Sequence, residues 1–243
     1  MEKEIILYHG SENIIENPIF GTGKKYNDYG LGFYCTKSKK LASEWAVDKN
    51  RDGYINKYNL DLNNLKILNL NQIDYPILTW LAVLIQNRTF DSYTQVQASA
   101  KDFLIQHFNI NYNDYDIIVG YRADDSYFQF AKAFLNSAIT YKTLTNAMYL
   151  GNLGNQYVLK SKRAFDSISF CNYENVASID WYSNKVEREE KARKLYSQSK
   201  NMRIQSDDIF FSDIIRGRLN EKENESLRQG ISTSNTRSSR SDT

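Results

Sequence analysis

Two short stretches near the N-terminus combine a histidine, glycines and a tyrosine in a pattern suited to binding a flat ring. His9-Gly10 follows an apolar segment, Glu4 to Tyr8, that is expected to be a strand ending at this pair. An imidazole and exposed main-chain groups can share one ligand at such a place. Farther along, two glycines one residue apart, Gly30 and Gly32, allow a turn in which backbone approaches a bound ring closely.

Tyr34 follows that turn within a strand expected from Phe33 to Thr36. Side chains alternate between the two faces of a strand, so Tyr34 faces a pocket if Phe33 faces the core. Each residue also has a plainer interpretation: His9 is a hydrogen-bonded histidine at a strand end, and Tyr34 belongs to the core. The functional interpretation depends on the residues being taken together.

Composition describes an ordinary globular protein of 243 residues, long enough for one substantial core or for one domain with an appendage. The net charge of +2 gives no overall field that would draw the chain to nucleic acid or to a membrane. Aromatic residues make up 14%, and 18 of them are tyrosines, which suit a groove for a planar ligand but also serve as ordinary core residues.

The segment 77–85 is too short to span a bilayer, and the N-terminus lacks an apolar signal run. Cys35 and Cys171 do not form a secreted disulfide framework. We therefore expect a cytoplasmic protein without a membrane partner, unless the chain is delivered into a target cell as an effector. The two histidines and two cysteines have no metal-ligand spacing, so we expect no metal site.

Hydrophobic periodicity predicts a mixture of strands and helices without regular βαβ alternation, which indicates the α+β class. The expected strands are residues 4–8, 33–36, 54–60, 65–70, 115–120, 156–161 and 164–170. The expected helices are residues 39–49 with Ser38 as N-cap, a helical segment 76–108, a helix carrying Phe128, and a charged helix 186–199. Residues 208–215 add an apolar packet that is expected to dock on the core. Neither a dinucleotide-binding glycine fingerprint nor a phosphate-binding P-loop is present.

With His9-Gly10, Gly30-x-Gly32-x-Tyr34 and Asn155-Gln156-Tyr157-Val158 in this order, the chain resembles the ADP-ribosyltransferase superfamily. The closer resemblance is to its His-Tyr-Glu group, which includes poly(ADP-ribose) polymerases and diphtheria-toxin-like toxins. The segment 34–46 is also similar to a small bacterial branch of previously unknown function. The resemblance covers roughly residues 4–170.

This resemblance implies a split β-sheet core with flanking helices and a helical insertion at about 76–108. It implies a catalytic domain over residues 1–183. The remaining chain divides into a charged helical extension over 184–227, which docks on the core, and a disordered tail over 228–243.

The resemblance also implies NAD as the bound molecule and assigns roles to residues of this sequence. His9 would bond a ribose hydroxyl, the main chain of Gly10 would hold the nicotinamide carboxamide, and Gly32 would also belong to the cofactor site. Tyr34 would stack on the nicotinamide ring. Thr36 or Ser38 would offer a hydroxyl to the carboxamide.

Gln156 stands where the group has its glutamate, and here the sequence departs from the pattern. A glutamine keeps a hydrogen bond but has neither negative charge nor useful basicity. Elongation into polymer is therefore not expected, and mono-ADP-ribosylation is. Asp124 and Asp125 are the nearest candidates for a substitute carboxylate in cofactor binding and catalysis, although they could equally cap the helix that follows.

Two further classes of function remain open. The domain could hydrolyse NAD without modifying a macromolecule, or it could be a non-catalytic interaction module that uses the charged helix and polar tail. An RNA 2′-phosphotransferase on the same fold would be expected to have more arginines near the site. For a transferase, the expected partners are an unidentified protein or nucleic-acid acceptor and a neutralising antitoxin, because small transferases of this kind are commonly toxins, effectors or phage-defence proteins.

Overall fold

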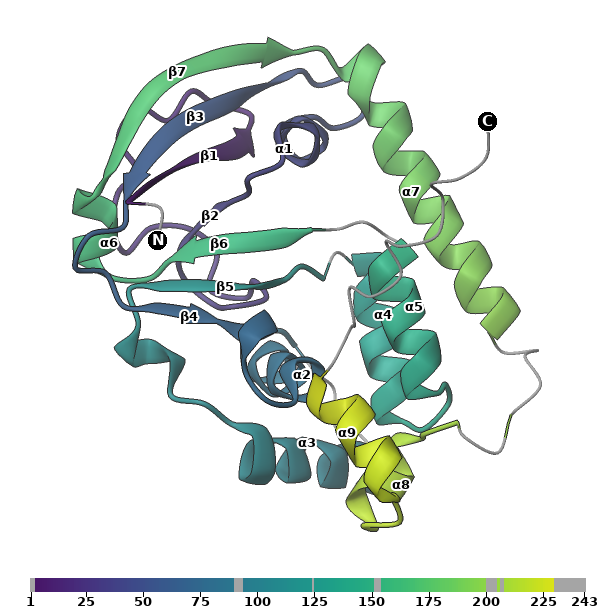
Figure 1. Cartoon of the computed structure of the whole chain (residues 1–243). Helices are drawn as coiled ribbons and strands as arrows, with labels where there is room; N and C mark the ends of the chain where they lie inside the picture. Colours follow the sequence, from purple (N-terminus) through teal and green to yellow (C-terminus); the bar gives the residue numbers. More distant parts are fainter. Residues whose placement is uncertain are drawn as a thin grey trace, which may run out of the picture.

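In the computed structural model, the strands form two sheets and the helices surround them (Figure 1). This arrangement confirms the α+β class. The structure describes residues 3–89, 94–123, 125–150, 154–199, 205 and 208–229. The strands are β1 (Glu4–Ser11), β2 (Phe33–Cys35), β3 (Gly53–Asp61), β4 (Ile67–Asn69), β5 (Ile117–Tyr121), β6 (Asn155–Leu159) and β7 (Ile168–Val176). The α-helices are α1 (Lys39–Ala46), α2 (Pro76–Asn87), α3 (Gln95–Phe108), α4 (Asp125–Leu135), α5 (Tyr141–Leu150), α6 (Lys162–Asp166), α7 (Ser178–Ser199), α8 (Phe211–Ile215) and α9 (Glu221–Gln229).

The strands form one sheet of three and one of four. The first has the order β1-β3-β7 and is antiparallel throughout, whereas the second has the order β2-β6-β5-β4 with a parallel β4–β5 pair. A bridge between Tyr8 and Thr36 joins β1 to β2, with main-chain bonds of 2.8 and 2.9 Å in the two directions. The two sheets are thereby connected at the point where the His9 and Tyr34 segments meet.

Alternation along the four-stranded sheet sorts its side chains between two apolar clusters. Ile117, Val119 and Leu159 face the three-stranded sheet, where Leu7 belongs to the same cluster. The opposite face, with Ile118 among its residues, packs against α2, α4 and α5, which lie beside this sheet in Figure 1. The four-stranded sheet is therefore buried on both faces.

The helical segment predicted over 76–108 is confirmed as the two helices α2 and α3, with residues 90–93 outside the described part. Helix α2 starts with Pro76 at its first turn, where a missing N–H costs nothing, and every residue from Pro76 to Ile85 is buried. A helix buried on all sides needs no polar face, which accounts for the nearly continuous apolar sequence of α2.

Two sequence-based boundaries are wrong. The strand expected to end at His9-Gly10 continues to Ser11, and His9 is paired with Asn56 within the ladder. The strand expected over 164–170 is instead the end of α6 followed by β7, because Ser161 caps a helical turn by accepting from the Ala164 amide at 3.1 Å.

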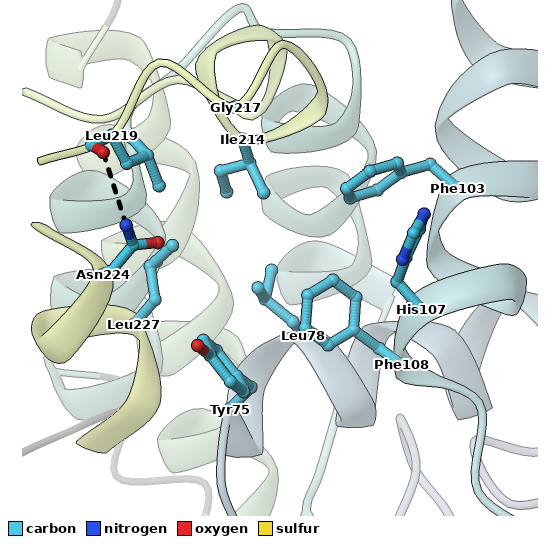
Figure 2. A pocket seen from close by; sticks show the side chains of 10 residues that line it. All are labelled: Tyr75, Leu78, Phe103, His107, Phe108, Ile214, Gly217, Leu219, Asn224 and Leu227. Atoms are coloured by element: carbon cyan, nitrogen blue, oxygen red, sulfur yellow. Dashed lines mark hydrogen bonds between the residues drawn. The ribbon is translucent and has the colours of Figure 1, made fainter. Parts of the chain in front are cut away.

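The C-terminal helices return to the core around α2 and α3. Helix α7 begins at Ser178, so the expected domain boundary at 183/184 falls inside it. Phe211, Ile214 and Leu227 are buried in the same cluster as α2. Between these helices and α2–α3 lies a cavity of about 190 Å³ (Figure 2). Of the tail expected over 228–243, residues 228 and 229 belong to α9, and residues 230–243 lie outside the described part.

The lining of the cavity combines aliphatic side chains such as Leu78 and Ile214 with aromatic side chains and Asn224, as Figure 2 shows. On the α3 side, the rings of Phe103 and His107 contact each other with a centroid distance of 4.5 Å and an interplanar angle of 40°. On the α9 side, Asn224 donates to the carbonyl of Leu219 at 3.3 Å. His107 is thus far from the sheets and belongs to the contact between α3 and the C-terminal helices.

Candidate functional site

His9 has one ring nitrogen fixed by the protein and the other open. Nδ1 lies 2.6 Å from the carbonyl oxygen of Tyr34. A carbonyl oxygen only accepts, so Nδ1 carries the proton and Nε2 is left as an acceptor. No described residue donates to Nε2. Burial lowers the pKa of His9 below 6.5, and the bond to Tyr34 offsets part of this change. The lowered pKa keeps the imidazole neutral at neutral pH.

The chain that follows His9 is held in place by a buried amide on the neighbouring strand. Asn56 has no solvent exposure, and its Nδ2 donates to the Ser11 hydroxyl at 2.9 Å. Its Oδ1 accepts from the Ile15 amide at 2.8 Å. Because both ends of this side chain are used, the segment 11–15 is fixed against β3 and the surroundings of His9 are preorganised.

Tyr34 binds the loop that carries the two glycines. Its hydroxyl donates to the Gly30 carbonyl at 2.5 Å and accepts from the Tyr29 amide at 3.1 Å. Burial raises the pKa of Tyr34, so the hydroxyl keeps its proton. The hydroxyl is therefore engaged by the loop, and the ring packs against the helical cluster.

His9 and Tyr34 meet through the main chain of β2 and not ring to ring. The His9 ring lies against Phe33 with a centroid distance of 4.5 Å. Phe33 packs with the inter-sheet cluster, whereas Tyr34 packs with the helical cluster on the other face. The structure thus brings these two side chains to adjacent positions on opposite faces of β2.

Gly10 and Gly32 lie where the backbone has close neighbours. A Cβ on Gly10 would come within 1.9 Å of the Ala42 carbonyl oxygen in α1. A Cβ on Gly32 would lie 2.8 Å from the Leu159 carbonyl oxygen in β6. Both glycines therefore have a packing reason, independent of the ligand contacts implied by the resemblance.

Thr36 and Ser38 position the start of α1. Thr36 is buried, and its hydroxyl oxygen accepts from the Ser38 amide at 3.1 Å. Ser38 is the N-cap, as the sequence predicts, and its hydroxyl accepts from the Leu41 amide at 3.3 Å. Each hydroxyl accepts one backbone amide in this turn, and its own O–H group is left to donate.

Gln156 is buried in β6 with only 4% of its surface exposed. It lies opposite Gly120 of β5, and it shares the Tyr34 face of the sheet because Val158, two residues along, pairs with Tyr34. Its Nε2 donates to Asp28 Oδ2 at 2.9 Å. No described residue donates to its Oε1, which is left as a second open acceptor.

Asp28 is the carboxylate that contacts Gln156, and sequence analysis missed it. It is 6% exposed, and its Oδ2 also accepts from the Ala123 amide at 2.8 Å. Arg88 Nη1 lies 3.4 Å from Oδ1. Burial raises the pKa of Asp28, and the Ala123 amide and the guanidinium groups of Arg88 and Arg122 offset part of the rise. The only sequence signal was its position directly before the Tyr29-Gly30 turn.

The two acidic residues proposed as substitutes are placed less fully. Asp124 lies outside the described residues, and Asp125 is the first residue of α4, with its side chain outside the described part. The carboxylate that the structure places against Gln156 comes from a different loop, 128 positions earlier in the chain.

Lys160 supports the loop that follows Asp28. Its Nζ donates to the carbonyl oxygens of Tyr29 and Leu31, each at 2.6 Å. Burial lowers the pKa of Lys160 to about 8. A neutral amine still has two N–H groups, so both bonds persist in either protonation state. The turn between Asp28 and Tyr34 is therefore held from β6 as well as by the Tyr34 hydroxyl.

Among the described residues, no three histidine, cysteine, aspartate or glutamate side chains gather as a metal-binding group. Both cysteines are free thiols, with Cys35 buried and Cys171 exposed. Over the same part of the chain, no helix combines the length and apolarity needed to cross a membrane.

The fold and the site geometry together define a two-sheet α+β domain with two open hydrogen-bond acceptors on strands that flank β2. Comparison with known families gives the chain its membership: it belongs to the family described as "Protein of unknown function (DUF3990)", whose model matches residues 5–170. The matched segment includes all the strands of the described residues except the first residue of β1 and the last part of β7, and α7, α8 and α9 follow it. No curated protein matches the chain, and no solved structure does.

Proposed function

We propose that this protein is an NAD-dependent mono-ADP-ribosyltransferase that transfers ADP-ribose to a protein or nucleic-acid acceptor. One observation carries the proposal: His9 Nε2 and Gln156 Oε1 are acceptors without a donor among the described residues, on strands that flank β2. A ribose offers hydroxyl groups that donate to such acceptors. Each acceptor, taken by itself, therefore fits a hydroxyl group of the kind that the two riboses of NAD carry.

The fold supports the same proposal in outline. An ADP-ribosyltransferase-like core would be a split sheet with its NAD site near the division between the halves. Here a three-stranded and a four-stranded sheet meet at the Tyr8–Thr36 bridge, next to His9 and Tyr34. Helices α2 and α3 correspond to the expected helical insertion.

In the proposed reaction, the bond between ribose C1′ and the nicotinamide nitrogen breaks, and its electron pair leaves with neutral nicotinamide. The acceptor nucleophile forms a bond to C1′ and loses a proton to solvent. NAD already carries a cationic leaving group, so holding and orienting it supplies much of the catalysis. His9 would accept from one ribose hydroxyl and Gln156 from another. The ring of Tyr34 would stack on nicotinamide, because its hydroxyl is already bound to the Gly30 carbonyl.

A glutamine at position 156 favours a single transfer. Its amide can accept a hydroxyl hydrogen bond but cannot remove the proton from an incoming hydroxyl. Extension of a first ADP-ribose into a polymer requires that activation. The product expected from this site is therefore one ADP-ribose unit for each modified position.

The test uses the full chain with NAD labelled on the adenylate phosphate and a cell lysate. Release of nicotinamide and label on macromolecules are measured together. His9→Phe and Gln156→Leu each remove one acceptor and are expected to lower nicotinamide release about tenfold or more. His107→Ala is the matched control, because His107 lines the cavity between α3 and the C-terminal helices. It should retain the wild-type rate.

Three outcomes separate the functions. Macromolecular label that depends on both acceptor residues supports transfer. Nicotinamide release without macromolecular label contradicts transfer and identifies NAD hydrolysis. If calorimetry detects no NAD binding and no nicotinamide is released, the enzymatic proposal is overturned. A non-catalytic interaction module is then the function that remains.

A further inference from the structure

We propose that Asp28 is a positioning residue that fixes the orientation of the Gln156 amide and so presents Oε1 to the ligand. The inference concerns the same site and rests on the proposed function for its catalytic consequence. Its structural part, the coupling between positions 28 and 156, can be tested whether or not the protein cleaves NAD.

The chemistry of the two groups determines the orientation. A carboxylate oxygen accepts hydrogen bonds and does not donate them, so the amide must turn its NH₂ group toward Asp28. Nε2 is 2.9 Å from Oδ2, as this requires. Rotation of the amide by 180° would place two acceptor oxygens against each other in a buried site. The pair therefore selects one of two otherwise similar amide rotamers.

Asp28 is itself held from two other elements. The Ala123 amide, just after β5, donates to the same Oδ2 at 2.8 Å. Arg88, just after α2, lies 3.4 Å from Oδ1 and also donates to the Ala123 carbonyl at 2.9 Å. A carboxylate held by these two donors besides Gln156 cannot swing away from Gln156. Arg88, after α2, and Ala123, after β5, therefore fix Asp28, and Asp28 in turn fixes the amide of Gln156 on β6.

Positioning and charge make different predictions at position 28. Asp28→Asn keeps an acceptor oxygen for both Gln156 and the Ala123 amide but removes the negative charge. Asp28→Ala removes both. If Asp28 positions Gln156, kcat for nicotinamide release should fall about tenfold or more in Asp28→Ala, with KM changed less. Asp28→Asn should retain most of the wild-type kcat.

A second set of variants tests the contact without any reaction. Gln156→Glu places a second carboxylate against Asp28, and two carboxylates at this distance cannot both be ionised. We expect the melting temperature to fall by about 5 °C or more. In the double variant Asp28→Asn with Gln156→Glu, position 28 carries no negative charge, so the repulsion between two carboxylates is absent. The loss caused by Gln156→Glu should therefore be at least halved when Asp28→Asn is already present.

The outcomes are distinct. Additive effects of the two substitutions on the melting temperature would overturn the inference, whatever the activity. Equal loss of kcat in Asp28→Asn and Asp28→Ala would also overturn it, because charge and not orientation would then be what Asp28 supplies. Coupling in the melting temperature together with an inactive wild-type chain would support the Asp28–Gln156 orientation and remove the transferase proposal instead. Coupling together with retained activity in Asp28→Asn supports both.

Discussion

Replacement of Lys160 by methionine should change how stability depends on pH. Lys160 donates to the carbonyls of Tyr29 and Leu31 from a mostly buried position, and burial lowers its pKa from 10.5 to about 8. Between these two pH values the unfolded chain binds a proton that the folded chain does not. The free energy of unfolding of the wild type should therefore rise with pH across this window.

The size of this effect follows from the shift. Each pKa unit is worth about 1.4 kcal/mol, so a fall from 10.5 to about 8 corresponds to about 3 kcal/mol before solvent is considered. Lys160 keeps some exposure, and screening reduces the expected gain to on the order of 1–2 kcal/mol. Lys160→Met has no titrating group at this position and should lack the gain.

Urea unfolding at pH 7 and at pH 10 measures the prediction. The difference in unfolding free energy between wild type and Lys160→Met should shift in favour of the wild type by on the order of 1–2 kcal/mol between these pH values. Ionisation of tyrosines affects both proteins and largely cancels in the difference. Lys162→Met is the control, because Lys162 is exposed and pairs with Asp166 at 2.7 Å. An equal shift in both variants, or none in Lys160→Met, would refute the reasoning.

Three further substitutions probe how the site is supported. Gly10→Ala should destabilise the fold by about 1–3 kcal/mol or more in urea unfolding, because its Cβ would lie 1.9 Å from the backbone oxygen of Ala42; wild-type stability would contradict the close packing of α1 on β1. Asp116→Asn should lower the free energy of unfolding by about 1–3 kcal/mol at pH 7. Burial alone would raise the pKa of Asp116, but bonds from the Ser161 hydroxyl, a main-chain amide and a guanidinium group lower it below 3.8 overall. The cost should therefore shrink as pH falls through the folded-state pKa, and a cost unchanged at pH 3 would contradict this. Glu44→Ala removes the carboxylate that pairs with the largely buried guanidinium of Arg188 in α7. The free energy of unfolding, measured by calorimetry, should fall by on the order of 3 kcal/mol, and an unchanged value would mean that the pair does not anchor α7.

Local sequence signals predicted much of the fold. Alternating apolar residues located β3, and short apolar runs located β1 and β5. A serine before an amphipathic run located the cap and start of α1. These features depend on neighbours within a few positions, which a single sequence displays directly. The errors lie where a local signal had two solutions. Residues 164–170 carry apolar side chains that suit a strand, but the Ser161 cap stabilises a helical turn first.

The sequence predicted the strand residues of the candidate site but not Asp28, the residue that contacts Gln156. His9, Tyr34 and Gln156 each occupy a recognisable position in or beside a strand. Asp28 lies in an irregular loop, and its contact with Gln156 joins residues 128 positions apart. Hydrophobic periodicity does not predict such a contact, because the contact forms only when β2 and β6 pair in the folded sheet. The structural reason for Gly10 was hidden for the same reason, since α1 follows it by some thirty residues.

The two open acceptors arise by the same physical device. His9 and Gln156 each have a donor and an acceptor end, and in both the donor end is bound to an oxygen of the protein. A carbonyl fixes Nδ1 of the imidazole and a carboxylate fixes Nε2 of the amide, so the end that remains can only accept. Each of these acceptors favours a ligand group that donates a hydrogen bond, such as a hydroxyl, and disfavours one that only accepts. The hydroxyl groups of the NAD that we propose as substrate are of the donating kind.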